Sequence, residues 1–333
     1  MTTLVTGATG FVGINIVEAL LERGEEVIAF AQAPMPEPAQ RSLARFSKTL
    51  SIVLGDVRDA EALGAVFKSR RVDRMVHGAV ITAGVDREKR DPVGIIDVNV
   101  GGTAQVLQSA REHVAGRMVY VSSGSAYGQS LFTEQRLYED TTPARPATMY
   151  QITKHAAERT ALRLRELWGL DLVCVRLGSV IGPWERDTGV RDTLSLHYQL
   201  ARLAAAGRSA ILPSRESRKD MIYSRDVAAA IVALLDAPVP SYTLYNVASG
   251  RSDWQGTLPA WCEQLKKIHG DFEFRVAKDD EQHNLSMSEK LDRAPMDIGR
   301  ITQDVGFKPA FGPQEAYADL SQWLQTQQSG SNR

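Results

Sequence analysis

A glycine repeat close to the start of the chain constrains the fold more than any other feature. The apolar run at residues 3–6 is followed at once by Gly7, Gly10 and Gly13, and residues 14–21 then have helical spacing. Between a strand and a helix, the first glycine of such a repeat permits a tight turn and the second lets the backbone approach a pyrophosphate. The third lets the helix pack on the strand. The pattern predicts a dinucleotide-binding turn, with the pyrophosphate at the N-terminus of the helix.

Further apolar runs alternate with helical segments through the first half of the chain. Strand-like runs occur at 27–30, 52–54, 74–79, 118–122 and 172–176. This alternation predicts an α/β fold, a Rossmann-like doubly wound parallel sheet that binds ligands at the carboxyl ends of its strands.

The alternation fades after residue 184. A strong helical pattern at 226–235 and a strand-like run at 242–247 suggest that the chain returns once to the main sheet. We therefore expect a dinucleotide-binding domain and a smaller C-terminal substrate-binding domain. The first is predicted at 1–177 plus about 226–250, the second at about 178–225 and 251–325, and a frayed polar tail at 326–333.

The composition excludes several classes of protein. With 333 residues and a formal charge of −1, the chain carries no electrostatic footprint for nucleic acid or for an anionic membrane. Cys174 and Cys262 are the only cysteines, so a disulfide framework is not expected. No run is long and apolar enough to span a bilayer, and the first strand leaves no room for a signal segment before it. We expect a cytoplasmic protein.

The ends of the second and third strands bear on the choice of cofactor. Phe30 is followed by Ala31 and Gln32, with neither a carboxylate for a ribose diol nor an immediate arginine, so NAD and NADP both stay open. Arg41 and Arg45 could reach a 2′-phosphate, although a solvated helix face explains them equally well. Asp56 is placed to bind the adenine amino group, or to serve as a turn residue.

A second set of residues is suited to proton transfer. Tyr150 and Lys154 lie four apart in a helical stretch and therefore share one face. A phenol is a poor base at neutral pH, but a neighbouring ammonium favours the phenolate. Ser123, just past the fifth strand, is the expected hydroxyl that hydrogen-bonds the reacting oxygen, with Ser122 and Ser125 as neighbours that could position the loop. This set predicts catalytic roles for Ser123, Tyr150 and Lys154.

With these motifs in place, the chain resembles the extended branch of the short-chain dehydrogenase/reductase superfamily, in particular the NAD-dependent epimerase/dehydratase family. Besides the motifs above, the resemblance includes the segments 97–103, 122–128, 219–223, 226–228, 245–247, 293–297 and 306–309, and Glu158 after Lys154. It covers nearly the whole chain. It implies a homodimer formed through helices near 93–112 and 150–167, and it implies that Asn99 supports the active-site lysine through water.

The resemblance also implies which residues bind the cofactor, NAD or NADP. These are Gly7, Gly10, Phe11, Val12, Gly13, Asp56, Val57, Ala79, Asn99, Tyr150, Lys154 and Leu177.

Substrate residues depart in part from the family pattern. Ser179 stands where family members that bind nucleotide sugars carry asparagine, and Lys219 stands where they carry arginine, which loses the bidentate fork. Arg293 matches the second arginine that contacts the diphosphate. Gly124 and Ser125 replace the Asp-Glu pair of sugar-nucleotide dehydratases, which argues against dehydration. The resemblance thus implies a substrate site made of Ser125, Ser179, Lys219 and Arg293.

Three further groups of residues have competing interpretations. Arg186, Arg191 and Arg218 could form a cluster that binds a carboxylate or phosphate, or could be solvated loop charges. The histidines have no metal-ligand spacing, so no metal site is expected, and packing or surface roles suffice for them. The tryptophans could wall a pocket, although core packing is the simpler interpretation. The histidines are His77, His155 and His197, and the tryptophans are Trp184, Trp254 and Trp261.

The motifs together predict an NAD(P)-dependent oxidoreductase or epimerase that acts at a secondary hydroxyl or ketone of a small carbohydrate-like substrate. The alternative is a simple dehydrogenase or reductase of a non-nucleotide sugar, a sugar acid or another hydroxy compound. A non-catalytic dinucleotide sensor is a remote alternative, because such proteins commonly lose the Tyr-Lys pair that this chain keeps.

Overall fold

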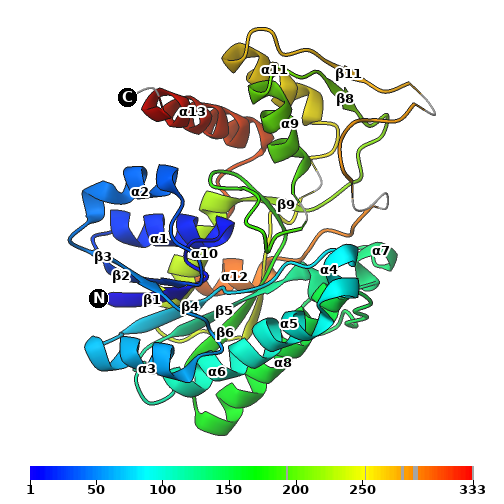
Figure 1. Ribbon diagram of the computed structural model, residues 1–333. Helices are drawn as coiled ribbons and strands as arrows, with labels where there is room; N and C mark the ends of the chain where they lie inside the picture. Colours follow the sequence, from blue (N-terminus) through cyan, green and yellow to red (C-terminus); the bar gives the residue numbers. More distant parts are fainter. Residues whose placement is uncertain (193, 252, 279–280, 288–291, 332–333) are drawn as a thin grey trace.

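Seven parallel strands form the central sheet of the protein (Figure 1). The structure is a computed structural model that describes residues 1–333 except 193, 252, 279–280, 288–291 and 332–333. The sheet order is β10-β6-β5-β4-β1-β2-β3. Its strands are β1 (Thr2–Thr6), β2 (Glu26–Ala31), β3 (Leu50–Leu54), β4 (Arg74–His77), β5 (Met118–Ser123), β6 (Leu172–Leu177) and β10 (Leu244–Val247). The predicted doubly wound fold is confirmed, including the return of the chain as β10 beside β6.

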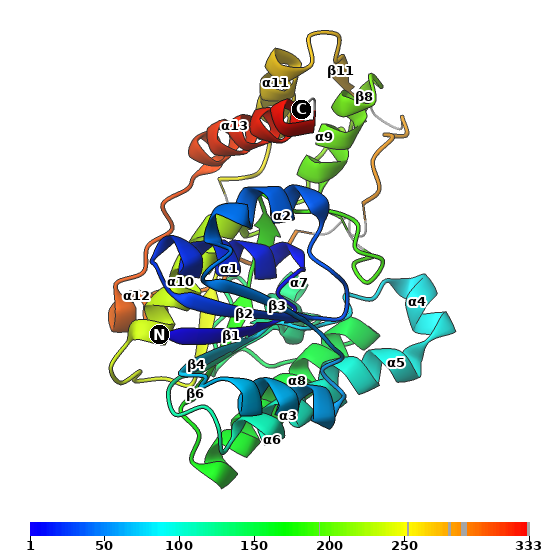
Figure 2. The ribbon, with the colours of Figure 1, turned by 60° about the vertical axis from the view of Figure 1, so that its left-hand side comes forward.

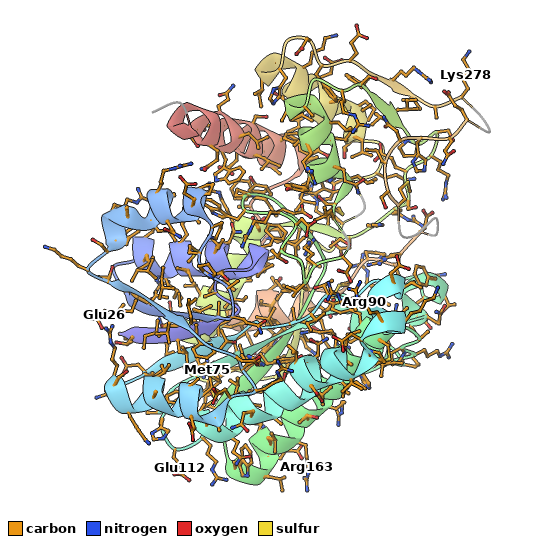
Figure 3. The ribbon with its side chains drawn as sticks, viewed as in Figure 1. Glu26, Met75, Arg90, Glu112, Arg163 and Lys278 are labelled. Carbon is orange, nitrogen blue, oxygen red and sulfur yellow. The ribbon has the colours of Figure 1, made fainter. Side chains whose placement is uncertain are left out.

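Successive side chains of each strand enter two different hydrophobic cores. Val5 packs in one core and Leu4 in the other, and the same alternation separates Val119 from Met118. A sheet with both faces covered needs strands that are apolar on both sides, which explains the continuous apolar runs in the sequence. In Figure 3, Met75 lies inside, while Glu112 and Arg163 project from the outer side of the helices.

Helices cover both faces of the sheet (Figures 1 and 2). One face carries α1 (Phe11–Glu22), α2 (Glu37–Leu43), α10 (Ser224–Asp236) and α12 (Gly299–Val305). The other carries α3 (Ala60–Ser69), α6 (Gly102–Ala110) and α8 (Met149–Trp168). Short elements connect them: η1 (Ala44–Phe46), α4 (Val85–Arg90), α5 (Pro92–Ile96), η2 (Asp97–Gly101), η3 (Gly124–Tyr127) and α7 (Ser130–Thr133).

The remaining elements build a second lobe above the carboxyl edge of the sheet (Figure 1). The strand pairs β7 (Ser179–Ile181) with β9 (Met221–Tyr223) and β8 (Ala210–Leu212) with β11 (Phe274–Val276) belong to this half of the chain. The helices are α9 (Leu196–Ala205), α11 (Leu258–Ile268) and α13 (Pro313–Ser331). A separate hydrophobic core, centred on Trp261 and Tyr317, joins α9, α11 and α13.

Two sequence predictions differ from the structure. The helix predicted at 93–112 is interrupted by the π-turn η2 and ends at Ala110. The tail predicted at 326–333 is wrong for its described part, because α13 continues to Ser331. Leu320 is buried in the second-lobe core, and Trp323 and Leu324 pack against it. Residues 332 and 333 lie outside the described residues. Within the described part of the chain, no helix has the length and apolarity needed to cross a membrane.

Candidate active site

The glycine turn between β1 and α1 packs without room for side chains. Gly7 has a φ of +68°, and a Cβ added there would lie 2.7 Å from the backbone nitrogen of Ala79. A Cβ on Gly13 would lie 2.1 Å from the carbonyl oxygen of Gly7. Gly10 precedes α1, and no side chain of the described residues caps the helix or places an acid in its first turn. The first N–H groups of α1, including those of Phe11 and Val12, are therefore oriented to bind an anion.

The carboxyl ends of β2 and β3 bring Gln32 and Asp56 together. Gln32 Nε2 donates to Asp56 Oδ2 at 3.4 Å, and Arg58 donates to the same carboxylate through Nε (3.0 Å) and Nη2 (2.6 Å). The Arg58 guanidinium beside Asp56 holds the pKa of that carboxyl below its usual range. Asp56 lies where the sequence predicts it, but a neighbouring arginine also holds it, which the sequence analysis missed. Val57 is buried beside it.

The two arginines considered for a 2′-phosphate are engaged elsewhere. Arg41 donates to Glu37 at 2.6 Å, and Arg45 donates to Glu22 at 3.0 Å, both at the exposed surface. The solvated-face interpretation therefore describes them better.

Lys154 is buried under β5 and donates two hydrogen bonds. Its Nζ donates to the carbonyl oxygen of Val121 at 2.6 Å and to the hydroxyl of Tyr120 at 3.0 Å. Nζ also lies 4.6 Å from the centre of the Tyr120 ring. An ammonium has three donors, so one is left for another acceptor. Burial lowers the pKa of Lys154 to about 7.

A chain of buried polar groups extends behind Lys154. The Tyr120 and His77 rings lie 5.6 Å apart, centre to centre, and Thr103 Oγ1 donates to the carbonyl oxygen of Asn99 at 2.7 Å. Because this uses the only proton of Thr103, His77 Nε2 donates to Thr103 Oγ1 across 3.0 Å, and His77 Nδ1 accepts from Thr6 Oγ1 at 2.6 Å. Burial lowers the pKa of His77 to about 3, so the ring is neutral. His77 therefore has a structural role, as expected, and both of its ring nitrogens are hydrogen-bonded.

The sequence analysis missed Tyr120 as a contact of Lys154. The available signal was the period of two along β5, which puts Tyr120 and Ser122 on the face that α8 covers. Ser122 Oγ donates to Glu158 Oε2 at 2.8 Å, and Arg176 donates to the same carboxylate at 2.9 and 2.6 Å. This buried network fixes α8 against β5 and β6.

Ser123 and Tyr150 lie at the adjoining ends of β5 and α8. Ser123 Oγ accepts from the backbone N–H of Ser125 at 3.1 Å, which leaves its own proton available for donation. The 3₁₀ turn η3 follows Ser123 directly, and Tyr150 is the second residue of α8. Thr148 begins α8 with a capping box that includes Gln151, so the position of Tyr150 in the first turn is well defined.

Asn99 lies in the π-turn η2 and connects two segments near the lysine. Its Oδ1 accepts from the N–H of Ile81 at 2.8 Å, and its Nδ2 donates to Thr153 Oγ1 at 3.0 Å. Thr153 precedes Lys154, so Asn99 is close to the lysine along the helix. The structure gives no direct bond between the two side chains, and support through water stays a prediction.

Two of the predicted substrate residues lie on neighbouring segments. The N–H of Arg293 donates to the carbonyl oxygen of Arg218 at 2.8 Å, which brings the backbone of Arg293 next to that of Lys219. Ser179 begins β7, where its N–H donates to the carbonyl oxygen of Asp220 at 2.9 Å.

The predicted arginine cluster does not form as a single group. Arg186 Nη2 donates to the carbonyl oxygen of Thr9 in the glycine turn, and the Arg191 guanidinium lies 5.2 Å from the centre of the Phe11 ring. Arg218, in contrast, lies 3.9 Å from Asp292. Two of the three arginines therefore flank the start of α1. This could not be foreseen, because Arg186 and Thr9 are 177 positions apart.

Among the described residues no cluster of His, Cys, Asp or Glu could hold a metal ion. Trp254 and Trp261 are buried in the core of the second lobe, as core packing predicts. Trp184 is also buried, but it lines a cavity as well.

A glycine turn at an uncapped helix, beside a buried lysine, a tyrosine and a serine at the carboxyl edge of a parallel sheet, defines a dinucleotide-dependent enzyme of Rossmann type. Residues 3–248 match the model of the NAD dependent epimerase/dehydratase family. The chain belongs to this family, as its resemblance to the extended short-chain dehydrogenases/reductases implies.

The chain is similar to proteins with different names. Sterol demethylase protein B of Methylococcus capsulatus is 30% identical over 265 residues, which cover 80% of this chain and 74% of that protein. UDP-glucuronate 4-epimerase 4 of Arabidopsis thaliana is 26% identical over 100% of this chain and 77% of its own. Among solved structures, Thermus thermophilus UDP-glucose 4-epimerase in complex with NAD superimposes with a TM-score of 0.74 at 25% identity, covering 98% of this chain and 99% of that one.

Proposed function

We propose that the protein is an NAD-dependent oxidoreductase that epimerises a secondary hydroxyl of a carbohydrate-like, nucleotide-linked substrate. The observation that carries this proposal is the buried Lys154, which has one free donor and lies one turn after Tyr150 on a helix that packs against β5, the strand that ends at Ser123. The names of the two epimerases among the relatives support the same activity.

The residues of the site have complementary roles in this proposal. Tyr150 accepts the proton of the substrate hydroxyl, and Ser123 donates a hydrogen bond to the reacting oxygen while keeping its own proton. The remaining N–H of Lys154 stabilises negative charge on the Tyr150 oxygen and orients the ribose diol of the cofactor. NAD supplies the hydride acceptor when it is bound. Return of the hydride to the opposite face of the ketone, with the proton returned by Tyr150, would give the epimer, whereas release of the ketone would make the protein a dehydrogenase.

The same site supports NAD rather than NADP. We assign the cofactor to the predicted set that runs from the glycine turn through Asp56, Val57, Ala79, Asn99 and Leu177 to Tyr150 and Lys154. Gln32 stands at the end of β2, and Arg41 and Arg45 pair with glutamates, so the described residues offer no unpaired arginine from α2 or η1 for a 2′-phosphate.

The residues proposed for the substrate site support a second candidate function. We propose that Ser125, Ser179, Lys219 and Arg293 line the substrate site. Ser179 and Lys219 replace the asparagine and arginine of nucleotide-sugar enzymes, which favours a dehydrogenase of a non-nucleotide hydroxy compound as the alternative. The relative that is named a sterol demethylase protein supports this alternative.

We also propose the domain division predicted from the sequence, with 1–177 and about 226–250 holding the cofactor. A homodimer through α5, α6 and α8 is supported by three exposed apolar side chains on α5 and α8. These are Val93 (65% exposed), Ile96 (46%) and Ile152 (42%). Light scattering on the wild type and on Ile152→Glu tests it: a dimer that becomes a monomer is the expected result.

A cytoplasmic location is part of the proposal, and it is supported by two buried cysteines that form no disulfide. The net charge of −1 likewise supports a small-molecule substrate rather than a nucleic acid.

The decisive experiment is to purify the protein without added cofactor, denature it and identify any released nucleotide by mass spectrometry. Retained NAD supports a cofactor that is recycled in place, and so the epimerase. An empty site that binds NAD reversibly supports the dehydrogenase. If neither NAD nor NADP binds, the proposed function is wrong.

A further inference from the structure

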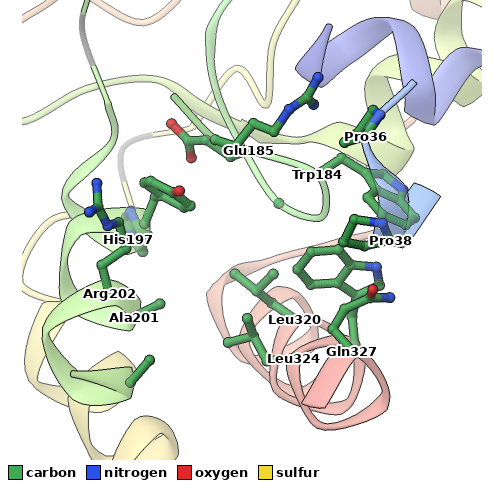
Figure 4. A pocket seen from close by; sticks show the side chains of 15 residues that line it. Pro36, Pro38, Trp184, Glu185, His197, Ala201, Arg202, Leu320, Leu324 and Gln327 are labelled. Carbon is green, nitrogen blue, oxygen red and sulfur yellow. The ribbon is translucent and has the colours of Figure 1, made fainter. Parts of the chain in front are cut away.

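A cavity of about 300 Å³ lies between the two lobes, and Ser123, Tyr150 and Lys154 do not line it. Its walls come from the segment after β2, the loop after β7, and helices α9 and α13. Figure 4 shows His197, Ala201 and Arg202 on one side of the hollow, with Leu320 and Leu324 facing them.

The walls of this cavity are almost entirely apolar. Besides the two leucines and Ala201, they include Pro36, Pro38, Trp184, Ala205 and Trp323. The Trp184 and Trp323 rings meet edge to face, with centroids 5.0 Å apart at an angle of 78°. Such walls bind an apolar body, and the volume falls at the lower end of the range for small-molecule sites.

Three lining residues have a buried hydrogen-bonding atom without a partner among the described residues: Arg186 Nη1, His197 Nδ1 and Trp323 Nε1. His197 is 6% exposed and its other nitrogen, Nε2, is hydrogen-bonded to the Tyr317 hydroxyl at 2.9 Å. Buried polar atoms normally find partners, so three unpaired atoms on residues that line one cavity point to a ligand with oxygen atoms.

Arg186 determines the charge of that ligand. No Asp or Glu of the described residues forms an ion pair with it, and its Nη2 is bonded to the carbonyl of Thr9. Glu185 beside it is already held by Arg191 Nη2 at 3.1 Å and by Ser195 Oγ at 2.5 Å. A partly buried guanidinium without a carboxylate is unfavourable, and an anionic ligand removes that deficit.

We propose that this cavity is a second small-molecule site, which binds a carboxylic acid with an apolar body the size of a medium-chain acyl group. The carboxylate lies on Arg186, and the apolar body packs between α9 and α13. This site goes beyond the proposed function. Because Arg186 also holds the glycine turn through Thr9, an occupant of the cavity borders the cofactor site.

The probe for this site is sodium decanoate, used below its micellar concentration on protein saturated with NAD. Trp184 and Trp323 line the cavity, so tryptophan fluorescence reports binding directly. We expect a saturable change with decanoate while NAD stays bound, as measured by equilibrium dialysis of the dinucleotide.

Charge and shape are tested with matched variants. Arg186→Gln is expected to weaken decanoate binding by at least about tenfold, because a charge-assisted hydrogen bond is lost. Arg202→Gln, on the rim of the same cavity, should change it less than about twofold. Decan-1-ol, which has the same body without the charge, should bind wild type and Arg186→Gln equally. Ala201→Trp fills the cavity and should abolish binding of both probes without affecting NAD.

Three results would overturn the inference. The first is fluorescence that decanoate leaves unchanged, and the second is binding to Arg186→Gln as tight as to the wild type. The third is displacement of NAD by decanoate, in which case Arg186 serves the diphosphate of the cofactor instead. If NAD itself does not bind, the proposed function fails. Titration of the NAD-free protein with decanoate then still shows whether the cavity binds the acid.

Discussion

The two lobes differ in how completely their buried polar groups are paired. In the sheet lobe, Lys154, Tyr120, Thr103 and His77 all have partners, and the Glu158 carboxylate is shared by a serine and an arginine. Of the nine unpartnered buried atoms among the described residues, six lie after Ile181, in the second lobe and the loop that leads to it. The sheet lobe is organised before any ligand arrives, whereas the second lobe has groups that a ligand can satisfy.

The largest expected effect is a loss of turnover from a substitution in the sheet lobe. Tyr150→Phe removes the proton acceptor and should lower turnover by ~10²–10⁴-fold, the usual contribution of general acid–base catalysis. Binding of NAD, followed by calorimetry, should change little. Unchanged turnover would show that Tyr150 is not the proton acceptor, whereas a wild type without turnover that still binds NAD would favour the dinucleotide-sensor alternative.

Glu158→Ala tests whether the sheet lobe depends on its internal pairing. The variant leaves Arg176 buried without its carboxylate partner, and such a loss costs about 3–5 kcal/mol of unfolding free energy, measured by urea denaturation. The matched change in the second lobe, Glu281→Ala, breaks the exposed pair with Arg275 and should leave the urea midpoint unchanged. Equal losses from both variants would remove the contrast between the lobes.

Gly13→Ala places a Cβ against the Gly7 carbonyl and so distorts the glycine turn. We expect NAD to bind at least about tenfold more weakly, as though one hydrogen bond to the diphosphate were lost. Gly64→Ala is the control: it lies in α3 with open space around it, and should add about 0.5–1 kcal/mol of stability without affecting NAD. Full NAD affinity in Gly13→Ala would disprove the assigned turn.

The smallest expected effect concerns Tyr120. A lysine whose pKa lies near 7 loses its charge as the pH rises through that value, so activity that needs the ammonium falls on the alkaline side. Tyr120→Phe removes an acceptor from the ammonium, disfavours the charged form, and should move the alkaline limb of the kcat/KM profile to lower pH. Tyr245→Phe, which breaks a bond to Asp304 instead, should leave the profile in place. If the two profiles coincide, Tyr120 is only a packing residue.

Sequence patterns predicted the sheet lobe well because its signals are local. The glycine turn, the strand that ends at Ser123 and the helix of Tyr150 each follow from spacing or apolar runs within a few residues. The hydrogen bond between Tyr120 and Lys154 depends on the fold, since 34 positions separate them. The alternation of side chains along β5 could still have placed Tyr120 on the face that α8 covers.

The second lobe was predicted less well because long-range contacts determine its structure. Helix α13 is polar along most of its length, and its few apolar residues, among them Tyr317 and Leu320, pack in the core around Trp261. The position of Arg186 on Thr9 likewise depends on how the loop after β7 crosses the edge of the sheet. No pattern in the sequence contains that information.

Trp184 has a consequence for anyone who redesigns this protein. It is the only non-glycine residue of the described chain with a positive φ, +70°, a conformation that disfavours a bulky side chain by about 1–2 kcal/mol. Its ring is nevertheless 4% exposed, and Nε1 donates to Glu18 at 3.3 Å. Local backbone preference and global packing are thus in conflict at this position, and such conflicts gather where a protein does its work. A sequence designed from backbone preference alone would choose glycine here, and it would erase one wall of the cavity between the lobes.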